Sequence, residues 1–126
     1  IRQVKAATVA DSISVDLPRD GDMAVRAVRE SKGIAVTVRD EDILDAIPLL
    51  ARSCGVFAEP AGAAGVAGLK RLAREGKIGG GERIVCLVTG NGLKDVDAAR
   101  RIAGGTIPVP PGLRELKAAA AAAGIA

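Results

Sequence analysis

Thr89 and the two glycines that follow it are residues whose types and spacing could do chemistry. They come directly after the apolar run Ile84 to Val88 and before a charged segment that begins at Lys94. In open α/β sheets, ligands bind beyond the carboxyl ends of the strands, which is where we expect this turn. The Thr89 hydroxyl and the backbone amides after it could hold an anion or one polar atom of a cofactor. The alternative is a tight strand-to-helix turn in which Gly90 and Gly92 adopt a positive φ.

Glu59 is the second residue that could face a ligand. It lies between the hydrophobic link Gly55 to Ala58 and a helix that we expect to start at Pro60, because proline suits a first helical position. The carboxylate could lie near a cofactor, or it could cap the first backbone amides of that helix. Two common phosphate-binding motifs are absent from the sequence: residues 90–95 lack the third glycine of G-x-G-x-x-G, and G-x-x-x-x-G-K-[ST] does not occur.

The composition excludes several classes of site. With no histidine among the 126 residues, a zinc site or a histidine-activated nucleophile is excluded, and Cys54 and Cys86 are too far apart for a C-x-x-C motif. The net charge of +3 is spread along the chain and Phe57 is the only aromatic residue, so we expect no nucleic-acid partner. No apolar run approaches the roughly 20 residues that span a bilayer, so we expect no membrane partner and a cytoplasmic protein.

Strand and helix patterns alternate along the chain. Short apolar or alternating runs predict strands, and apolar stripes at helical spacing predict helices. This alternation predicts an α/β fold in three layers, with a mainly parallel sheet and helices on both faces. The expected strands are 12–17, 34–38, 55–58 and 83–88, and the expected helices are 23–32, 41–54, 60–75 and 93–103.

Two details of the expected helices concern their caps and packing. Asp40 is predicted to cap the helix that follows it, since a carboxylate can accept hydrogen bonds from the first amides. Gly62, Gly65 and Gly68 lie inside the expected helix 60–75, where each glycine costs up to about 1 kcal/mol relative to alanine. A helix tolerates such residues where another backbone or a ligand approaches closely.

The composition divides the chain into three parts. Residues 1–103 carry the alternating pattern, residues 104–112 form a linker rich in proline and glycine, and residues 113–126 are expected to form an alanine-rich helix. The chain starts at Ile1, and its only methionine, Met23, falls inside an expected helix. We therefore expect a piece of a longer protein.

Two longer stretches resemble a known family. The stretches GVFAEPAGAAGVAGLKRL, residues 55–72, and VCLVTGNGLKD, residues 85–95, are similar to the C-terminal part of threonine synthase. Threonine synthase is a pyridoxal-phosphate enzyme of the fold type II group, which includes the tryptophan synthase β subunit. The order of the remaining segments is similar to that family over nearly the whole chain. The resemblance implies an incomplete, C-terminal part of a fold type II enzyme, with residues 1–103 in its catalytic domain.

The resemblance also implies roles for the candidate residues. Thr89 would hydrogen-bond the pyridine nitrogen of pyridoxal 5'-phosphate, Glu59 would lie close to the ring, and Gly90 would let the backbone pass near the cofactor. The family's Schiff-base lysine motif and glycine-rich phosphate loop have no counterpart in these residues. We therefore expect no catalytic residue in this chain, which alone would be inactive and hold no cofactor.

The implied full-length enzyme is a lyase of threonine biosynthesis. It would convert O-phosphohomoserine and water to threonine and phosphate, acting on a small amino-acid substrate as a homodimer. Two alternatives stay open. One is another fold type II lyase, such as a threonine or serine dehydratase, and the other is a stand-alone interaction domain that buries an aliphatic surface against a partner.

Overall fold

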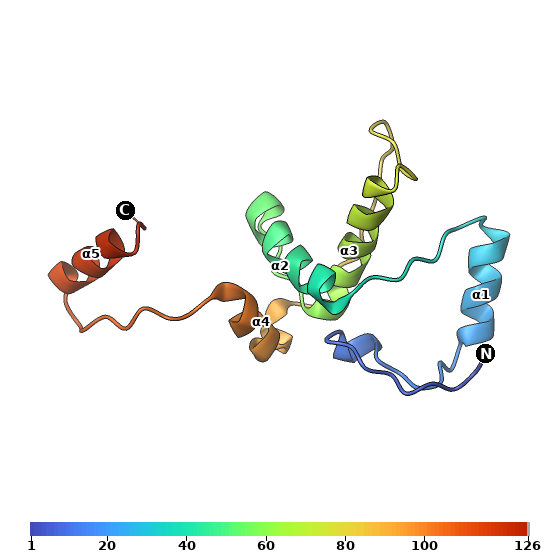
Figure 1. Ribbon diagram of the computed structural model, residues 1–126, viewed down its shortest axis with the longest axis horizontal. Coiled ribbons are helices and arrows are strands. Elements are labelled where there is room, and N and C mark those ends of the chain that lie inside the picture. The colour runs from blue at the N-terminus through green and yellow to red at the C-terminus, as the bar shows by residue number, and fades with distance from the viewer. Residues whose placement is uncertain (126) are drawn as a thin grey trace.

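Helices form the framework of the chain. The computed structural model describes residues 1–125. Figure 1 shows α2 and α3 together at the centre, and α4 also packs against α2. In chain order the elements are η1 (Asp11–Ile13), α1 (Gly21–Glu30), α2 (Asp40–Cys54), α3 (Pro60–Arg74), η2 (Gly92–Lys94), α4 (Val96–Ala103) and α5 (Leu113–Ala122).

The core lies between α2 and α3 and consists of small aliphatic side chains. Ile47 on α2 is the largest fully buried side chain, and Ala63 and Ala67 face it from α3 within one cluster. Small residues let the two helices approach closely, so that burial of modest side chains still excludes water. The buried cluster comprises Ala10, Ile43, Ala46, Ile47, Ala58, Ala63 and Ala67.

The expected helices at 23–32, 41–54, 60–75 and 93–103 correspond to α1, α2, α3 and the region of η2 and α4. Pro60 is the first residue of α3, as its fixed φ and missing amide donor favour. Three acidic residues occupy the first turn of α2, where the helix dipole favours negative charge. Local sequence patterns therefore determine where these helices lie.

Asp40 does not cap α2, so that prediction was wrong. The cap position is Arg39, and no side chain there bonds the helix amides. The Asp40 carboxylate instead accepts hydrogen bonds from the Thr8 hydroxyl at 2.6 Å and from the Val9 backbone amide at 3.2 Å. Asp40 thus ties the N-terminal segment to the start of α2.

The expected parallel sheet is not formed within residues 1–125. Segments 34–38 and 83–88 are irregular and make no backbone–backbone hydrogen bond to another described segment, and the expected strand 12–17 begins with η1. The single β-type pairing described is an antiparallel bridge between Ala58 and Asn91. A strand is completed only by hydrogen bonds to a neighbouring strand, and these segments have none here. The sheet and its three layers stay a prediction.

Two of the three glycines inside α3, Gly62 and Gly68, provide space for these two segments, whereas a Cβ on Gly65 would meet no atom within 4 Å. A Cβ on Gly62 would lie 3.3 Å from a methyl group of Val88, and a Cβ on Gly68 would lie 3.1 Å from a methyl group of Val36. The Arg71 guanidinium also donates to the Thr37 carbonyl. Both apolar segments therefore contact α3, although they are not paired with one another.

The C-terminal part is set apart from the other helices in Figure 1. Residues 104–110 have no regular structure, and α5 spans Leu113–Ala122. The division into residues 1–103, a linker at 104–112 and a helix at 113–126 stays a prediction, and Ala126 lies outside the described residues.

Within residues 1–125, the longest helices are α2 and α3 at 15 residues each, and no helix has the length and hydropathy needed to cross a bilayer.

Candidate functional site

The two sequence motifs meet at the antiparallel bridge between Ala58 and Asn91. The Glu59 amide donates to the Gly90 carbonyl at 3.0 Å, and the Gly92 amide donates to the Phe57 carbonyl at 2.9 Å. Residues 57–59 and 90–92 therefore form one hydrogen-bonded unit. Candidate residues that are far apart in the sequence lie next to each other in this unit.

Gly90 and Gly92 are required by close packing. Neither has a positive φ, so the alternative that they serve a left-handed turn is wrong. A Cβ on Gly90 would overlap the Glu59 carboxylate, and a Cβ on Gly92 would overlap the Phe57 ring. The segment after Thr89 thus fits against residues 57–59 only because it has no side chains at these two positions.

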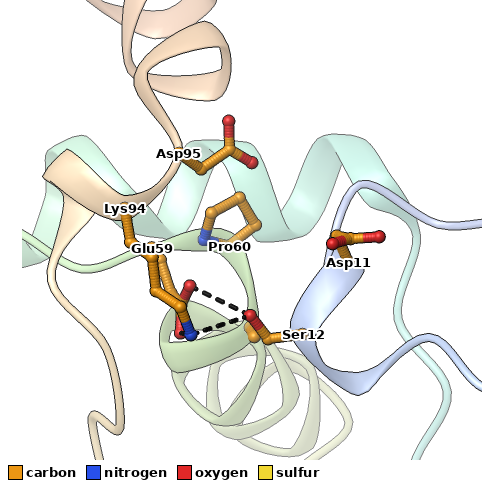
Figure 2. A pocket seen from close by; sticks show the side chains of 7 residues that line it. Asp11, Ser12, Glu59, Pro60, Lys94 and Asp95 are labelled. Atoms are coloured by element: carbon orange, nitrogen blue, oxygen red, sulfur yellow. Dashed lines mark hydrogen bonds and ion pairs between the residues drawn. The ribbon is translucent and has the colours of Figure 1, made fainter.

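The Glu59 side chain is buried, at 4% exposure, and belongs to a polar cluster that we call the Glu59 cluster: Ser12, Glu59 and Lys94. Ser12 Oγ donates to Glu59 Oε2 at 3.2 Å, and Lys94 Nζ lies 3.4 Å from Glu59 Oε1 and 3.1 Å from Ser12 Oγ (Figure 2). Glu59 precedes α3, but its side chain makes no capping hydrogen bond to that helix. The capping alternative for Glu59 is therefore wrong.

A cavity of about 350 Å³ opens beside the Glu59 cluster. Its charged lining is mainly acidic, and the Lys94 ammonium is the one cation among the lining residues. Asp95 is already engaged, because its carboxylate accepts from the Ala98 amide at 2.9 Å and caps α4. The full lining is Asp11, Ser12, Glu59, Pro60, Ala61, Lys94 and Asp95.

Thr89 lies on another cavity, of about 380 Å³. Its side chain is exposed, and within residues 1–125 its hydroxyl makes no hydrogen bond. Phe57 also lines this cavity, so an aromatic side chain and a free hydroxyl border the same space. The other lining residues are Gly55, Val56, Val88, Gly90 and Asn91.

The structure brings the predicted residues together in one region but separates their side chains. Thr89 and Glu59 lie on either side of Gly90, and each lines a cavity that the other does not. Of the predicted residues, Gly90 alone both contacts the Glu59 carboxylate and lines the Thr89 cavity.

Sequence reasoning missed two residues of the Glu59 cluster. Ser12 was placed in an expected strand and Lys94 in an expected helix with no role in a site, whereas both side chains contact the buried carboxylate. A signal was present for Lys94, because a buried Glu59 requires a cationic partner and Lys94 follows the motif that packs on it. Ser12 gave no such signal. No group of three or more metal-binding side chains was found within the described part of the chain.

Comparison with known proteins gives one family and several relatives. A profile of the family described as "Pyridoxal-phosphate dependent enzyme" matches residues 1–90. The threonine synthase of Methanocaldococcus jannaschii is 46% identical over 110 residues, which cover 87% of this chain and 27% of that protein. The threonine synthase of Mycobacterium tuberculosis strain H37Rv is 45% identical over 103 residues, or 82% of this chain and 29% of that protein. That of Halalkalibacterium halodurans is 47% identical over 92 residues, or 73% and 26%. The chain thus spans less than a third of the length of these relatives.

Proposed function

Because this chain belongs to the pyridoxal-phosphate-dependent enzyme family, we propose that it is the C-terminal part of a threonine synthase. The whole protein would convert O-phosphohomoserine and water to threonine and phosphate. The identity of 45% to 47% to the three threonine synthases supports this substrate over that of a dehydratase.

The observation that carries the proposal is the free hydroxyl of Thr89 at its cavity. A threonine hydroxyl both donates and accepts hydrogen bonds, so it can pair with a pyridine nitrogen in either protonation state. Phe57 lines the same cavity and gives it apolar surface. The Glu59 carboxylate fills the space where a Gly90 Cβ would lie, so the backbone next to Thr89 packs closely against Glu59. These residues fit one edge of a pyridoxal-phosphate ring.

Bound pyridoxal phosphate supplies an electron sink for bond cleavage in an amino-acid substrate. Thr89 would orient the ring through its nitrogen. A neutral hydroxyl does not force that nitrogen to stay protonated, as a carboxylate partner would, so Thr89 moderates the electron sink. Glu59 would pack against Gly90 on the side away from the cofactor and so hold the backbone next to Thr89 in place. None of these residues is proposed to form a covalent bond.

The test is a pair of assays on the whole protein. With O-phosphohomoserine as substrate, we expect equal amounts of phosphate and threonine to be released. With threonine as substrate, we expect no significant release of ammonia. Release of ammonia from threonine, without phosphate release from O-phosphohomoserine, would reject the proposal in favour of a dehydratase.

We further propose that residues 1–126 alone are inactive, because the lysine motif that binds the cofactor in this family has no counterpart here. The same phosphate assay tests this on the isolated chain. Turnover by the isolated chain would show that the chemistry needs no residue beyond these.

A further inference from the structure

We propose that Ser12 and Lys94 are positioning residues, which act through the Glu59 carboxylate to hold Gly90, and hence Thr89, in place. The inference rests on the proposed function, since Thr89 is the residue whose position matters. It adds two residues, Ser12 and Lys94, that do not line the Thr89 cavity.

The first step is the burial of Glu59. A buried carboxylate is stable only when it is paired and hydrogen-bonded, because removing the charge from water is costly. Ser12 and Lys94 are the two side chains that bond this carboxylate, and they come from η1 and η2. The cluster therefore joins three separate segments of the chain at one point: η1, the start of α3, and η2.

The second step is the contact between the carboxylate and Gly90. The space that a Cβ of Gly90 would occupy is filled by Glu59 Oε1 and the carboxylate carbon. The Glu59 backbone amide also donates to the Gly90 carbonyl at 3.0 Å. Any rotation of the Glu59 side chain therefore changes the packing of the residue directly after Thr89.

The third step is the charge on Lys94. The Lys94 side chain is 61% exposed, while the carboxylate it pairs with is 5% exposed, so the ammonium reaches in from the surface. Without that cation, Glu59 would be left buried with only a neutral partner. The carboxylate would then turn toward water, and Gly90 and Thr89 would lose the surface that fixes them.

The experiment titrates the whole apoprotein with pyridoxal 5'-phosphate and follows cofactor absorbance, together with the melting temperature of the apoprotein. Lys94→Met keeps the aliphatic stem and removes the charge. We expect it to raise the Kd for the cofactor at least about tenfold, because a buried charge loses its partner. We expect Lys94→Arg to stay within about threefold of the unmodified protein, because the charge is kept.

Lys77→Met is the matched control. Lys77 forms an ion pair with Glu75 at 2.7 Å near the end of α3, and it lines neither cavity. The control therefore removes a lysine charge from an ion pair outside the cluster. Its cofactor Kd is expected to be unchanged.

The same Lys94 substitution made in a Glu59→Gln protein tests whether Lys94 acts through Glu59 or directly on the cofactor. In a Glu59→Gln protein no buried charge needs neutralising, so Lys94→Met should raise the Kd less than about twofold further. An equal effect of Lys94→Met in both backgrounds would overturn the proposal. An unchanged Kd with a lowered melting temperature would also overturn it, because the cluster would then serve folding alone.

Ser12→Ala keeps the proposal testable if Lys94→Met does not fold. This variant leaves the ion pair intact and removes one hydrogen bond, so the Kd should rise in the same direction by a smaller factor. An unchanged Kd in Ser12→Ala would then count against the cluster. If the unmodified whole protein itself bound no pyridoxal phosphate, the proposed function would fail, and the inference with it.

Discussion

At the scale of single residues, the main feature of the site is that the Glu59 cavity and the Thr89 cavity lie on opposite sides of one glycine, Gly90. Glu59 and Thr89 face separate cavities, and only the backbone at Gly90 lies between them. One side is charged and hydrogen-bonded, and the other offers a free hydroxyl beside an aromatic ring. A change on the Glu59 side should therefore reach the Thr89 cavity through the packing at Gly90.

Thr89→Val in the whole protein tests the hydroxyl. Valine has nearly the same shape, so the protein should still fold and bind pyridoxal phosphate. We expect a shifted cofactor absorbance and a turnover at least about tenfold lower, equivalent to about 1.4 kcal/mol. Thr106→Val, at an exposed position outside the site, is the control and should change neither. Unchanged absorbance and rate in Thr89→Val would remove Thr89 from the site.

Gly90→Ala tests the close packing after Thr89. The new methyl group overlaps the Glu59 carboxylate, so the side chain or the backbone must move, and overpacking of this kind costs about 1–3 kcal/mol. Urea denaturation should show this loss of unfolding free energy. Gly65→Ala is the matched control, since Gly65 is exposed within α3 and a Cβ there meets no atom within 4 Å. That variant should be neutral or stabilised by up to about 1 kcal/mol.

At the scale of elements, the sequence predicted the helices, which depend on residues close together in the chain. It did not predict the contacts between residues far apart in the chain. The α2 and α3 helices follow from apolar stripes, first-turn acids and Pro60, all of which act within a few residues. Segments 34–38 and 83–88 are apolar enough to be strands, but a strand also needs a partner that no local pattern supplies. The bond between Lys94 and Ser12 joins residues 82 positions apart, so spacing in the sequence could not reveal it.

The C-terminal end of α3 should be sensitive to acid. Hydrogen bonds from Lys77 and Arg71 lower the pKa of Glu75 from 4.5 to about 2. Since the folded pKa is the lower one, the stabilising contribution is present above pH 4.5 and is lost as the pH falls toward 2.

The measurement is the pH dependence of the unfolding free energy for the unmodified protein and for Glu75→Gln. We expect the two proteins to differ at neutral pH and to converge as the pH falls to about 2, with a small difference because the pair is exposed. Lys77→Met should reduce the difference, as it removes the largest cause of the shift. A difference that stays constant from pH 7 to pH 2 would contradict the assignment.

At the scale of the whole molecule, apolar surface is left uncovered where a sheet was predicted. Val85 is 87% exposed and Leu87 is 80% exposed, on a segment with unpaired backbone groups. Exposed apolar segments with free backbone donors and acceptors are sites of association. The predicted homodimer remains untested, but this segment is the place where we expect contacts beyond the 126 residues.

Residues 1–126 produced alone should therefore self-associate. Sedimentation velocity is expected to show dimers or larger species, and replacing Val85 and Leu87 together with lysine should shift the chain toward monomer. Ile1→Lys, which alters an exposed apolar residue outside the segment, is the control and should leave association unchanged. A monodisperse monomer for the unmodified chain would instead support a stand-alone module.

The bridge between Ala58 and Asn91 has a consequence for tolerance to insertion and deletion. The bridge holds together the two ends of residues 59–90, a segment that contains α3, the tip with the exposed glycines at 79–81 and the return to Val88. Extra residues at that tip lengthen a loop whose ends are already fixed, and the entropic cost of closing a loop grows only slowly with its length. The number of residues between the two motifs can therefore differ among relatives, while the two motifs keep the same position relative to each other in space.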